Sequence, residues 1–151
     1  MIGFKIITLI IDSTYTNKSN DQLINDLVGK PFSFFEKIKL KGIGSKRMII
    51  ENSSDNLKPY LNTVSDVNYA NLELRPSGVL VRINKGLQTF VWVIPYYQLV
   101  IYKVNGSSIH AQGRFIQFKN SRTLKENKSF FRKLLDRKVL FDEQYNFNYN
   151  L

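Results

Sequence analysis

Residues 70–95 read ANLELRPSGVLVRINKGLQTFVWVIP, in which three strand-like segments are separated by two turns. Apolar and polar residues alternate through the first six positions, as on a strand with one buried face. The turn Pro76-Ser77-Gly78 leads to a partner strand at 79–83, and Asn84-Lys85-Gly86 leads to a third at 88–94. The third segment is apolar on both faces, which is typical of a central or doubly covered strand. Closely spaced strands joined by tight turns predict an antiparallel meander.

Beyond Pro95 the meander is predicted to continue and then to end against a helix. Three further strand patterns lie at 99–104, 107–111 and 114–119. Asn105-Gly106 is the strongest short-range hairpin signal in the chain. Residues 125–138 then change to helical spacing with one apolar stripe. The stripe consists of Phe130, Phe131, Leu134 and Leu135. We predict that this amphipathic helix covers the sheet, and that 141–151, which lacks a clear period, forms a tail.

The N-terminal part of the chain indicates a strand and a short helix. Residues 6–11 form an apolar run much shorter than the ~20 residues that span a bilayer. No small-residue cleavage site of a secretory signal follows, so a β-strand is predicted there. Residues 21–28 place their apolar side chains on one helical face. Ser19 or Asn20 is the expected N-cap, and Gly29 is the expected stop.

The next segment is rich in lysine and is predicted to be a β-hairpin. Apolar residues alternate with three lysines through 34–41, so we expect a half-buried strand with those lysines in solvent. The three are Lys37, Lys39 and Lys41. A turn at 42–45 leads to the hairpin partner at 46–52. Residues 52–65 are polar, contain Pro59 and are expected to cross the surface with one helical turn.

Together these elements predict a single domain at 1–140, of the α+β class and mainly β. Its bent antiparallel sheet, or partly open barrel, is closed by the C-terminal amphipathic helix and preceded by a strand, a short helix and a hairpin. The order of meander, Pro-aromatic step and terminal helix resembles the pleckstrin-homology-like (PH-like) domains of bacteria and the related GRAM type. The resemblance covers about 67–140 and is carried by LELRPSGVLV at 72–81, VIPYYQL at 93–99 and FFRKLL at 130–135.

The resemblance implies a bent PH-like sheet, in which the Pro-aromatic step marks the passage between the two halves. It implies no lipid-headgroup specificity, because the phosphoinositide pattern of basic residues around the first hairpin has no match here. The same stretch is also similar to small proteins of Bacteroidetes-type bacteria, a likeness that implies no activity. Abundant Lys, Asn, Ile, Phe and Tyr fit an AT-rich genome, which by itself raises the basic count.

Charge is the main functional signal in the sequence. The 151 residues carry a formal net charge of +10, which favours anionic partners. Residues 30–47 contain six basic residues and one acidic, and residues 119–138 contain eight and two. Such segments suit the phosphates of nucleic acid or of an anionic membrane surface, although outward lysines also discourage edge-to-edge aggregation. The candidate anion-binding residues are Lys37, Lys39, Lys41, Lys46, Arg47, Lys128, Arg132, Lys133 and Arg137.

Aromatic residues accompany both basic segments. Phenylalanines at 32, 34, 35, 130 and 131 can stack on nucleic-acid bases, but their spacing favours a place in the core. Tyr96 and Tyr97 follow Pro95 at a bend that leaves at least one ring at the surface. These two tyrosines are the candidate protein-binding residues.

No set of residues in the sequence indicates catalysis. The chain has no cysteine, which excludes a disulfide, a thiolate metal site and a thiol nucleophile. His110 is the only histidine, so one chain has no two-histidine metal site, and we interpret it as structural. Residues 42–46 read GIGSK but lack the spacing and order of a nucleotide P-loop, so a hairpin turn is expected.

The function predicted from the sequence is a non-enzymatic interaction module in the cytoplasm that recognises a protein or an anionic ligand, without cofactor or metal. The alternative is a nucleic-acid-binding protein that uses the nine basic candidates as phosphate contacts. An anionic membrane surface is a further candidate partner. An enzyme would have to combine His110 with scattered carboxylates. Whether the two basic segments form one face is the observation that most separates these hypotheses.

Overall fold

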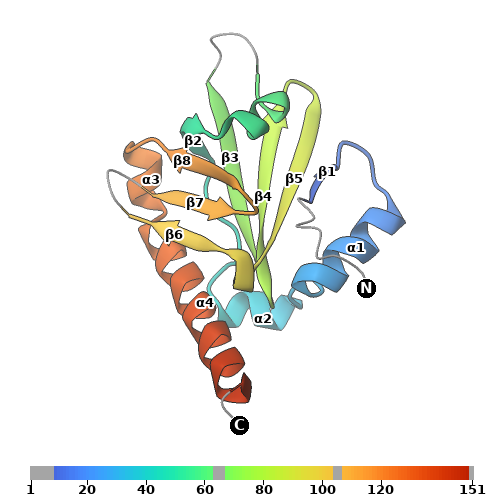
Figure 1. The fold of residues 1–151 in the computed structure, drawn as a ribbon, viewed down its shortest axis with the longest axis vertical. Coiled ribbons are helices and arrows are strands. Elements are labelled where there is room, and N and C mark those ends of the chain that lie inside the picture. Colours follow the sequence, from blue (N-terminus) through green and yellow to red (C-terminus); the bar gives the residue numbers. More distant parts are fainter. Residues whose placement is uncertain (1–8, 63–66, 104–106, 150–151) are drawn as a thin grey trace.

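A computed structural model describes residues 9–62, 67–103 and 107–149, with side chains as far as 144. Within these residues the protein is an α+β fold, mainly β, built on one eight-stranded antiparallel sheet (Figure 1). The strands are β1 (Ile10–Asp12), β2 (Met48–Ser53), β3 (Asn68–Arg75), β4 (Gly78–Lys85), β5 (Gln88–Pro95), β6 (Val100–Tyr102), β7 (Ser108–Ala111) and β8 (Arg114–Phe118). The helices are α1 (Lys18–Val28), α2 (Phe34–Lys39), α3 (Arg122–Glu126) and α4 (Lys128–Tyr149), with 3-10 turns η1 (Asp55–Tyr60) and η2 (Tyr96–Gln98).

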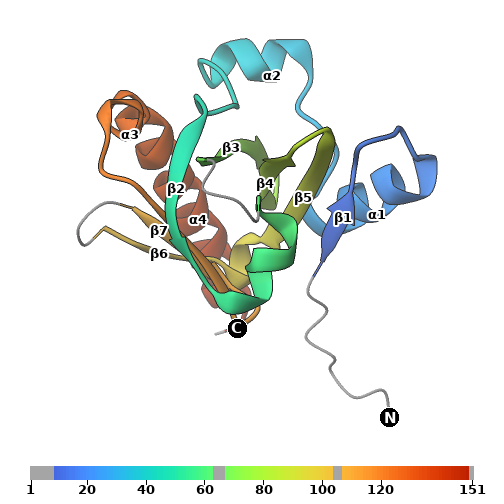
Figure 2. The ribbon, with the colours of Figure 1, turned by 90° about the horizontal axis from the view of Figure 1, so that it is seen from above.

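The sheet contains two three-stranded meanders with β2 between them. The strand order is β1-β5-β4-β3-β2-β8-β7-β6, so the sheet is open and β1 and β6 are its edges. β2 pairs with β3 on one side and β8 on the other, and its register with β8 shifts between Ile50 and Asn52. Seen from above, the sheet curls around its concave face (Figure 2). The predicted fold class and the bent sheet are therefore confirmed.

The predicted continuous meander is wrong at one point, because β5 and β6 are not neighbours in the sheet. Pro95 ends β5 and is followed directly by η2, in which the Tyr96 amide donates to the Ser77 carbonyl at 3.0 Å. Since proline has no amide proton, it cannot continue the hydrogen-bond ladder of a central strand. The chain then crosses to the opposite edge of the sheet and begins the second meander.

The predicted strand at 34–41 is also wrong, because this segment contains α2. Ser33 and Glu36 form a capping box: the Glu36 amide donates to the Ser33 hydroxyl, and the Ser33 amide donates to the Glu36 carboxylate. These two bonds satisfy backbone amides at the start of the helix, which in a strand would need a neighbouring strand as partner. Their stabilisation of the helix outweighs the strand preference that the alternating pattern indicates. β2 overlaps the predicted hairpin partner at 46–52, but it pairs with β3 and β8 instead of with a strand at 34–41.

Two other N-terminal predictions are confirmed with changed limits. The predicted helix at 21–28 begins earlier, at Lys18, because Asn17 rather than Ser19 or Asn20 is the N-cap. It ends at Gly29, as expected, with a φ of +89° that suits glycine. Half of the predicted first strand, 6–8, lies outside the described residues, and β1 occupies 10–12. The helical turn expected around Pro59 is η1.

The C-terminal helix covers the sheet as predicted, but it is longer and interrupted. Asn127 separates α3 from α4, and α4 continues through 149, so the described part of the predicted tail is helical. Phe131 and Leu134 are 4% and 0% exposed, and Leu135 is half-buried. The helix extends below the sheet (Figure 1), where it needs no regular apolar stripe, and this explains why the period fades in the sequence.

The hydrophobic core lies on both faces of β5. Trp92 and Ile94 join the main core between the curved sheet and α4, whereas Val91 and Val93 pack with Ile24 and Val28 of α1. The prediction of a doubly covered strand from its two apolar faces is thus confirmed. The Asn105-Gly106 turn lies outside the described residues, but the strands on either side, β6 and β7, pair antiparallel.

Candidate functional site

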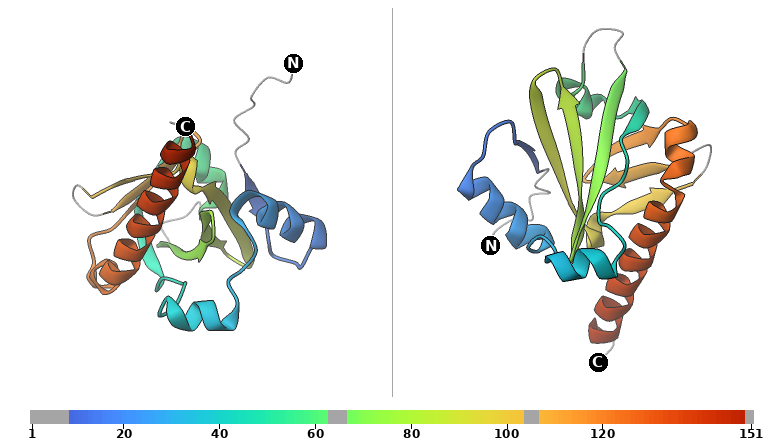
Figure 3. Two further views of the ribbon diagram at one scale, coloured as in Figure 1. Left: turned by 90° about the horizontal axis from the view of Figure 1, so that it is seen from below. Right: turned by 180° about the vertical axis from the view of Figure 1, so that it is seen from behind.

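The two basic segments of the sequence lie next to each other in the structure. The Lys133 ammonium on α4 donates to the carbonyls of Leu40, Lys41 and Gly42, at 3.0, 3.2 and 3.0 Å. In a view from behind, α2 and the segment leading from it into β2 lie beside α4 (Figure 3). The C-terminal end of α2 is therefore fixed to the terminal helix.

A second set of contacts joins the two basic segments at the start of α4. The Asn127 carboxamide accepts from the Lys46 amide at 2.8 Å and donates to the Lys46 carbonyl at 3.1 Å. The Lys46 ammonium also pairs with Glu126 at 3.2 Å. Because Asn127 is 3% exposed, these hydrogen bonds are shielded from water and fix the start of α4 against the segment before β2.

Four of the nine candidate anion-binding residues are engaged in intramolecular contacts. Lys133 and Lys46 make the contacts above. The Arg47 guanidinium lies over the Tyr69 ring at 4.1 Å, and that of Arg137 lies over the Phe32 ring at 4.9 Å. These side chains hold elements together, which accounts for part of the basic excess without any ligand.

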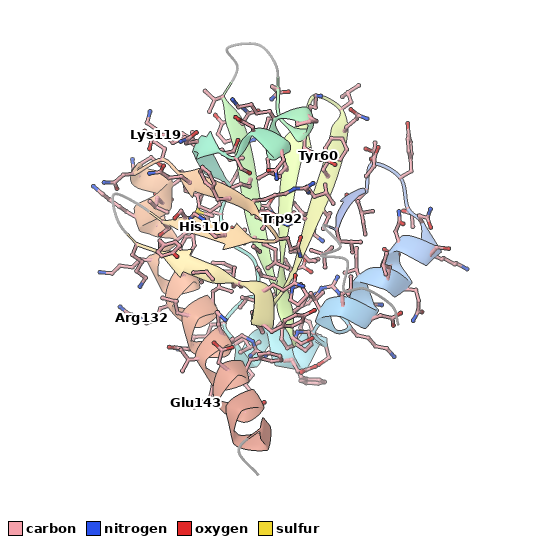
Figure 4. All side chains as sticks on the ribbon, in the orientation of Figure 1. Tyr60, Trp92, His110, Lys119, Arg132 and Glu143 are labelled. Carbon is pink, nitrogen blue, oxygen red and sulfur yellow. The ribbon has the colours of Figure 1, made fainter. Side chains whose placement is uncertain are left out.

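The other five candidates are exposed and form two flanks, one on and just after α2 and one on α4. They are Lys37, Lys39, Lys41, Lys128 and Arg132. On α4, Lys133 faces the end of α2, whereas Arg132 is displaced by about 100° around the helix and shares its face with Lys128 four residues earlier. Figure 4 shows Arg132 projecting from α4 away from the sheet. The adjoining basic segments thus present lysines in two directions.

A cleft lies on the Lys128 flank, where the ends of β6 and β7 meet α3 and α4. Its volume is about 280 Å³. The lining residues are Lys103, Ser107, Asn120, Leu124, Lys125, Lys128 and Phe131. Leu124 and Phe131 are nearly buried and supply apolar surface, while three ammonium groups, a hydroxyl and a carboxamide supply hydrogen-bond donors.

Sequence reasoning found only part of this cleft. Lys128 was among the candidates, whereas Lys103, Asn120 and Lys125 were not. Lys125 and Lys128 are three residues apart, a separation that brings side chains to the same side of a helical segment. Lys103 joins them only because the second meander returns beside the terminal helices, which no local pattern shows.

The two candidate tyrosines have opposite environments. Tyr97 is 64% exposed, as expected for one ring at the bend, but Tyr96 is fully buried and is therefore excluded as a surface contact. The Tyr96 hydroxyl donates to the Arg75 carbonyl at 3.0 Å, and its ring packs against Phe141. Burial raises the pKa of Tyr96. Its place in the core follows from the turn at η2, which points it inward.

The five phenylalanines near the basic segments also divide. Phe32, Phe130 and Phe131 are buried, as their spacing suggested, but Phe34 and Phe35 on α2 are 72% and 81% exposed. The expectation of a core position fails for these two because it assumed that α2 was a strand.

His110 lies among aromatic rings on the face of β7 opposite the core. Its ring stacks on Phe115 with centroids 5.2 Å apart and meets Tyr102 edge to face at 4.8 Å. Nε2 is 3.1 Å from the Ser108 hydroxyl. Partial burial lowers the pKa of His110, which favours the neutral ring. These contacts agree with the structural role inferred from the sequence.

The GIGSK turn at 42–46 joins α2 to β2, an order opposite to the strand-to-helix order of a P-loop. The Ser45 hydroxyl accepts from the Leu72 amide at 2.8 Å, and the Ser45 amide donates to the Leu72 carbonyl. The turn is therefore anchored on β3, although it is not the hairpin turn that was expected.

Other clusters offer less specific chemistry. A hollow of about 400 Å³ beside β2 and η1 has a mixed lining that includes Glu51, Lys58 and three asparagines. Among the residues that the structure describes, no group of three His, Cys, Asp or Glu side chains could hold a metal ion. Over the same residues, no helix is both long and apolar enough to cross a bilayer.

Comparison with known proteins adds no relative, since no family model, curated protein or solved structure matches the chain.

Proposed function

We propose that this protein is a non-enzymatic interaction module that binds an anionic ligand in the cleft between the β6–β7 end of the sheet and the α3–α4 helices. The observation that carries the proposal is the convergence of Lys103, Lys125 and Lys128 around an apolar floor. Three ammonium groups at one rim create a positive potential that a single exposed lysine does not. Hydrogen bonds from these charged groups to an anion are stronger than bonds between neutral groups.

The shape and lining of the cleft favour a small amphiphilic anion, such as a phosphate monoester with a short apolar group. The ammonium groups, Ser107 and Asn120 can all donate to phosphate oxygens, while Leu124 and Phe131 can contact carbon. The lining residues include no carboxylate or imidazole to accept a proton, so the arrangement suits holding an anion better than transforming it.

The proposal includes a PH-like organisation of the sheet. Four strands, β2 to β5, precede the Pro-aromatic step, three strands follow it, and α4 packs across the bend. This order supports the resemblance drawn from 67–140; β2 lies before that range and completes the first half of the sheet, while β1, α1 and α2 are additions.

The nucleic-acid alternative has weaker support. Long nucleic acids need phosphate contacts along one continuous track, whereas the exposed candidates are divided between α2 and the outer face of α4. Four of the nine proposed phosphate contacts are already engaged with carbonyls, a carboxylate or aromatic rings. The two hypotheses therefore predict different ligands: a small amphiphilic phosphate for the interaction module, and duplex DNA for the nucleic-acid-binding protein.

Titration of the full chain with octyl phosphate and with inorganic phosphate, followed by amide chemical shifts, tests the proposal. We expect both to shift residues around Lys125 and Lys128, and octyl phosphate to bind more tightly because its chain contacts the floor. Lys125→Met with Lys128→Met should weaken octyl phosphate binding about tenfold or more. The matched pair Lys18→Met with Lys58→Met removes the same charge elsewhere and should leave affinity unchanged.

Two results would overturn the proposal. One is equal loss of affinity in the two paired variants, which would mean that only net charge matters. The other is tight, steeply salt-dependent binding of mixed-sequence duplex DNA with no response to octyl phosphate, which would favour the nucleic-acid alternative.

A further inference from the structure

The helix α2 exposes an unusual amount of apolar surface. Phe34, Phe35 and Ile38 are 72%, 81% and 59% exposed, and none of the six residues of α2 is buried. Exposed apolar residues are common singly, but three on one short helix form a patch of the kind that marks an interaction site. Because these three side chains are mostly exposed, packing within the monomer does not explain why they are apolar.

The lysines of α2 flank this apolar patch. At about 100° per residue, Phe34, Ile38 and Phe35 occupy one arc of about 100° around the helix. Lys37 lies about 60° beyond Phe34 on one side, and Lys39 about 40° beyond Phe35 on the other. The helix therefore has an apolar stripe with a cation along each margin, and Glu36 lies on the opposite side.

The structure fixes α2 at both ends, so the patch is presented rigidly. The Ser33–Glu36 capping box closes the first turn, and Phe32, just before it, lies buried beneath Arg137. Lys133 holds the carbonyls at the C-terminal end. The following turn is bonded to β3, where the Leu74 amide donates to the Ile43 carbonyl at 2.8 Å.

We propose that α2 docks this protein on the surface of an anionic lipid bilayer. The two phenyl rings and Ile38 enter the boundary between headgroups and acyl chains, while Lys37 and Lys39 extend to lipid phosphates on either side. Lys41, which follows the helix and is also exposed, adds a third cation near the surface. This inference goes beyond the proposed function, because it uses a different surface from the cleft.

Charge and shape favour a bilayer over other occupants. A second copy of the chain would bring two sets of lysines together in a protein that already carries +10. Nucleic acid gives Ile38 no favourable partner, although the rings could stack on bases. A convex helix with three projecting side chains needs a deep groove on a protein partner, whereas a bilayer accepts it without a preformed shape.

Flotation of the full chain with vesicles tests the proposal. We expect binding to vesicles of phosphatidylcholine mixed with phosphatidylglycerol and little binding to phosphatidylcholine alone. Lys37→Ala with Lys39→Ala should weaken binding by about fivefold for each lysine. The triple variant Phe34→Ala, Phe35→Ala, Ile38→Ala should abolish flotation and keep the native circular dichroism spectrum, because none of these residues is buried.

Two controls separate the stripe from general effects. Lys18→Ala with Lys58→Ala removes equal charge elsewhere, and Leu87→Ala removes an apolar side chain that is 98% exposed in another turn. Both variants should float like the original chain. Phe35→Trp supplies a direct probe: its fluorescence should shift to shorter wavelength with anionic vesicles and be quenched by brominated acyl chains. Trp92 is fully buried and provides a constant background.

The proposal is overturned if the triple variant still floats, if the Phe35→Trp signal is unaffected by brominated chains, or if the lysine pair and its control lose binding equally. Binding of duplex DNA or an acidic peptide that requires the apolar stripe, without vesicle binding, would reassign the surface. Inorganic phosphate and glycerol phosphate should not displace the chain from vesicles, because a free headgroup does not replace the acyl boundary. The cleft variants are tested with octyl phosphate, so either proposal can fail alone.

Discussion

Replacing Lys133 with methionine should detach the end of α2 from α4 without disturbing the core. The Lys133 ammonium donates to the carbonyls of Leu40, Lys41 and Gly42, all within 3.2 Å. A hydrogen bond from a charged group contributes about 1.5–3 kcal/mol, but only the bond to Leu40 is partly buried, and water can replace the two exposed ones. Lys133 is only half-buried, and ordering its long side chain costs up to about 2 kcal/mol. We therefore expect the free energy of unfolding to fall by about 1–2 kcal/mol.

The loss should be concentrated in α2, so two measurements are needed. Urea denaturation gives the global change, and native-state hydrogen exchange gives the local one, with faster exchange expected for the amides of Leu40, Lys41 and Gly42. Methionine retains most of the apolar stem of lysine, and Lys128→Met on the exposed flank is the matched control. If Lys133→Met matches that control in both measurements, the ammonium does not hold α2 and the reasoning fails.

Three further predictions concern the fold and the first turn of α2. Gly78→Ala should cost more than about 3 kcal/mol in urea denaturation, because the new Cβ would lie 2.3 Å from Val28 Cγ1 and 2.5 Å from the Ile94 carbonyl oxygen. Gly44→Ala, with its nearest neighbour at 3.9 Å, should cost less than about 1 kcal/mol, and equal costs would refute the packing argument. Leu134→Ala should destabilise by about 2–5 kcal/mol in the same assay, and a cost below about 1 kcal/mol would show that α4 does not close the core. The bonds from the Ser33 amide and hydroxyl lower the pKa of Glu36 below 4.5, so its stabilisation of α2 is present above that pH and is lost as the pH falls through the lowered pKa. Amide exchange in α2 should accelerate there, and Glu36→Gln, which keeps an acceptor but does not titrate, should remove the pH step.

Most of the sheet could be predicted from the sequence, because alternation and turn residues act locally. β3, β4 and β5 follow the pattern of 70–95, and the two apolar faces of the last of these correctly indicated cover on both sides. The strand order could not be predicted in the same way. Insertion of β2 between β3 and β8 depends on contacts between distant residues, such as Ile50 with Phe118, for which no short pattern exists.

The error at α2 shows how a short segment can satisfy two periods. Alternation through 34–41 fits a strand, and the Ser33–Glu36 spacing fits a helix start; the capping box decides between them. This choice changes the functional interpretation, because a strand would have turned Ile38 inward, whereas the helix leaves it 59% exposed. The lysines were identified as surface residues under both interpretations, so the charge was the more robust signal.

The cleft was harder to foresee than the charge. Its lysines come from the residue after β6, from α3 and from α4, and only the return of the second meander beside the terminal helices brings Lys103 to Lys125 and Lys128. Conversely, Lys133 and Arg137 belong to the basic segment at 119–138 but make contacts within the protein. Lys133 donates to a carbonyl at the end of α2, and Arg137 packs over the Phe32 ring. Sequence alone does not distinguish a cation that binds a ligand from one that binds its own chain.

The most direct test of whether the excess charge forms a recognition surface is lysine acetylation mapped by mass spectrometry. It is carried out with and without vesicles that contain phosphatidylglycerol. Slower modification of Lys37 and Lys39 on vesicle binding, with Lys18 and Lys58 unchanged, is the result that the account predicts. Equal protection at all four positions, or protection confined to Lys18 and Lys58, would contradict it.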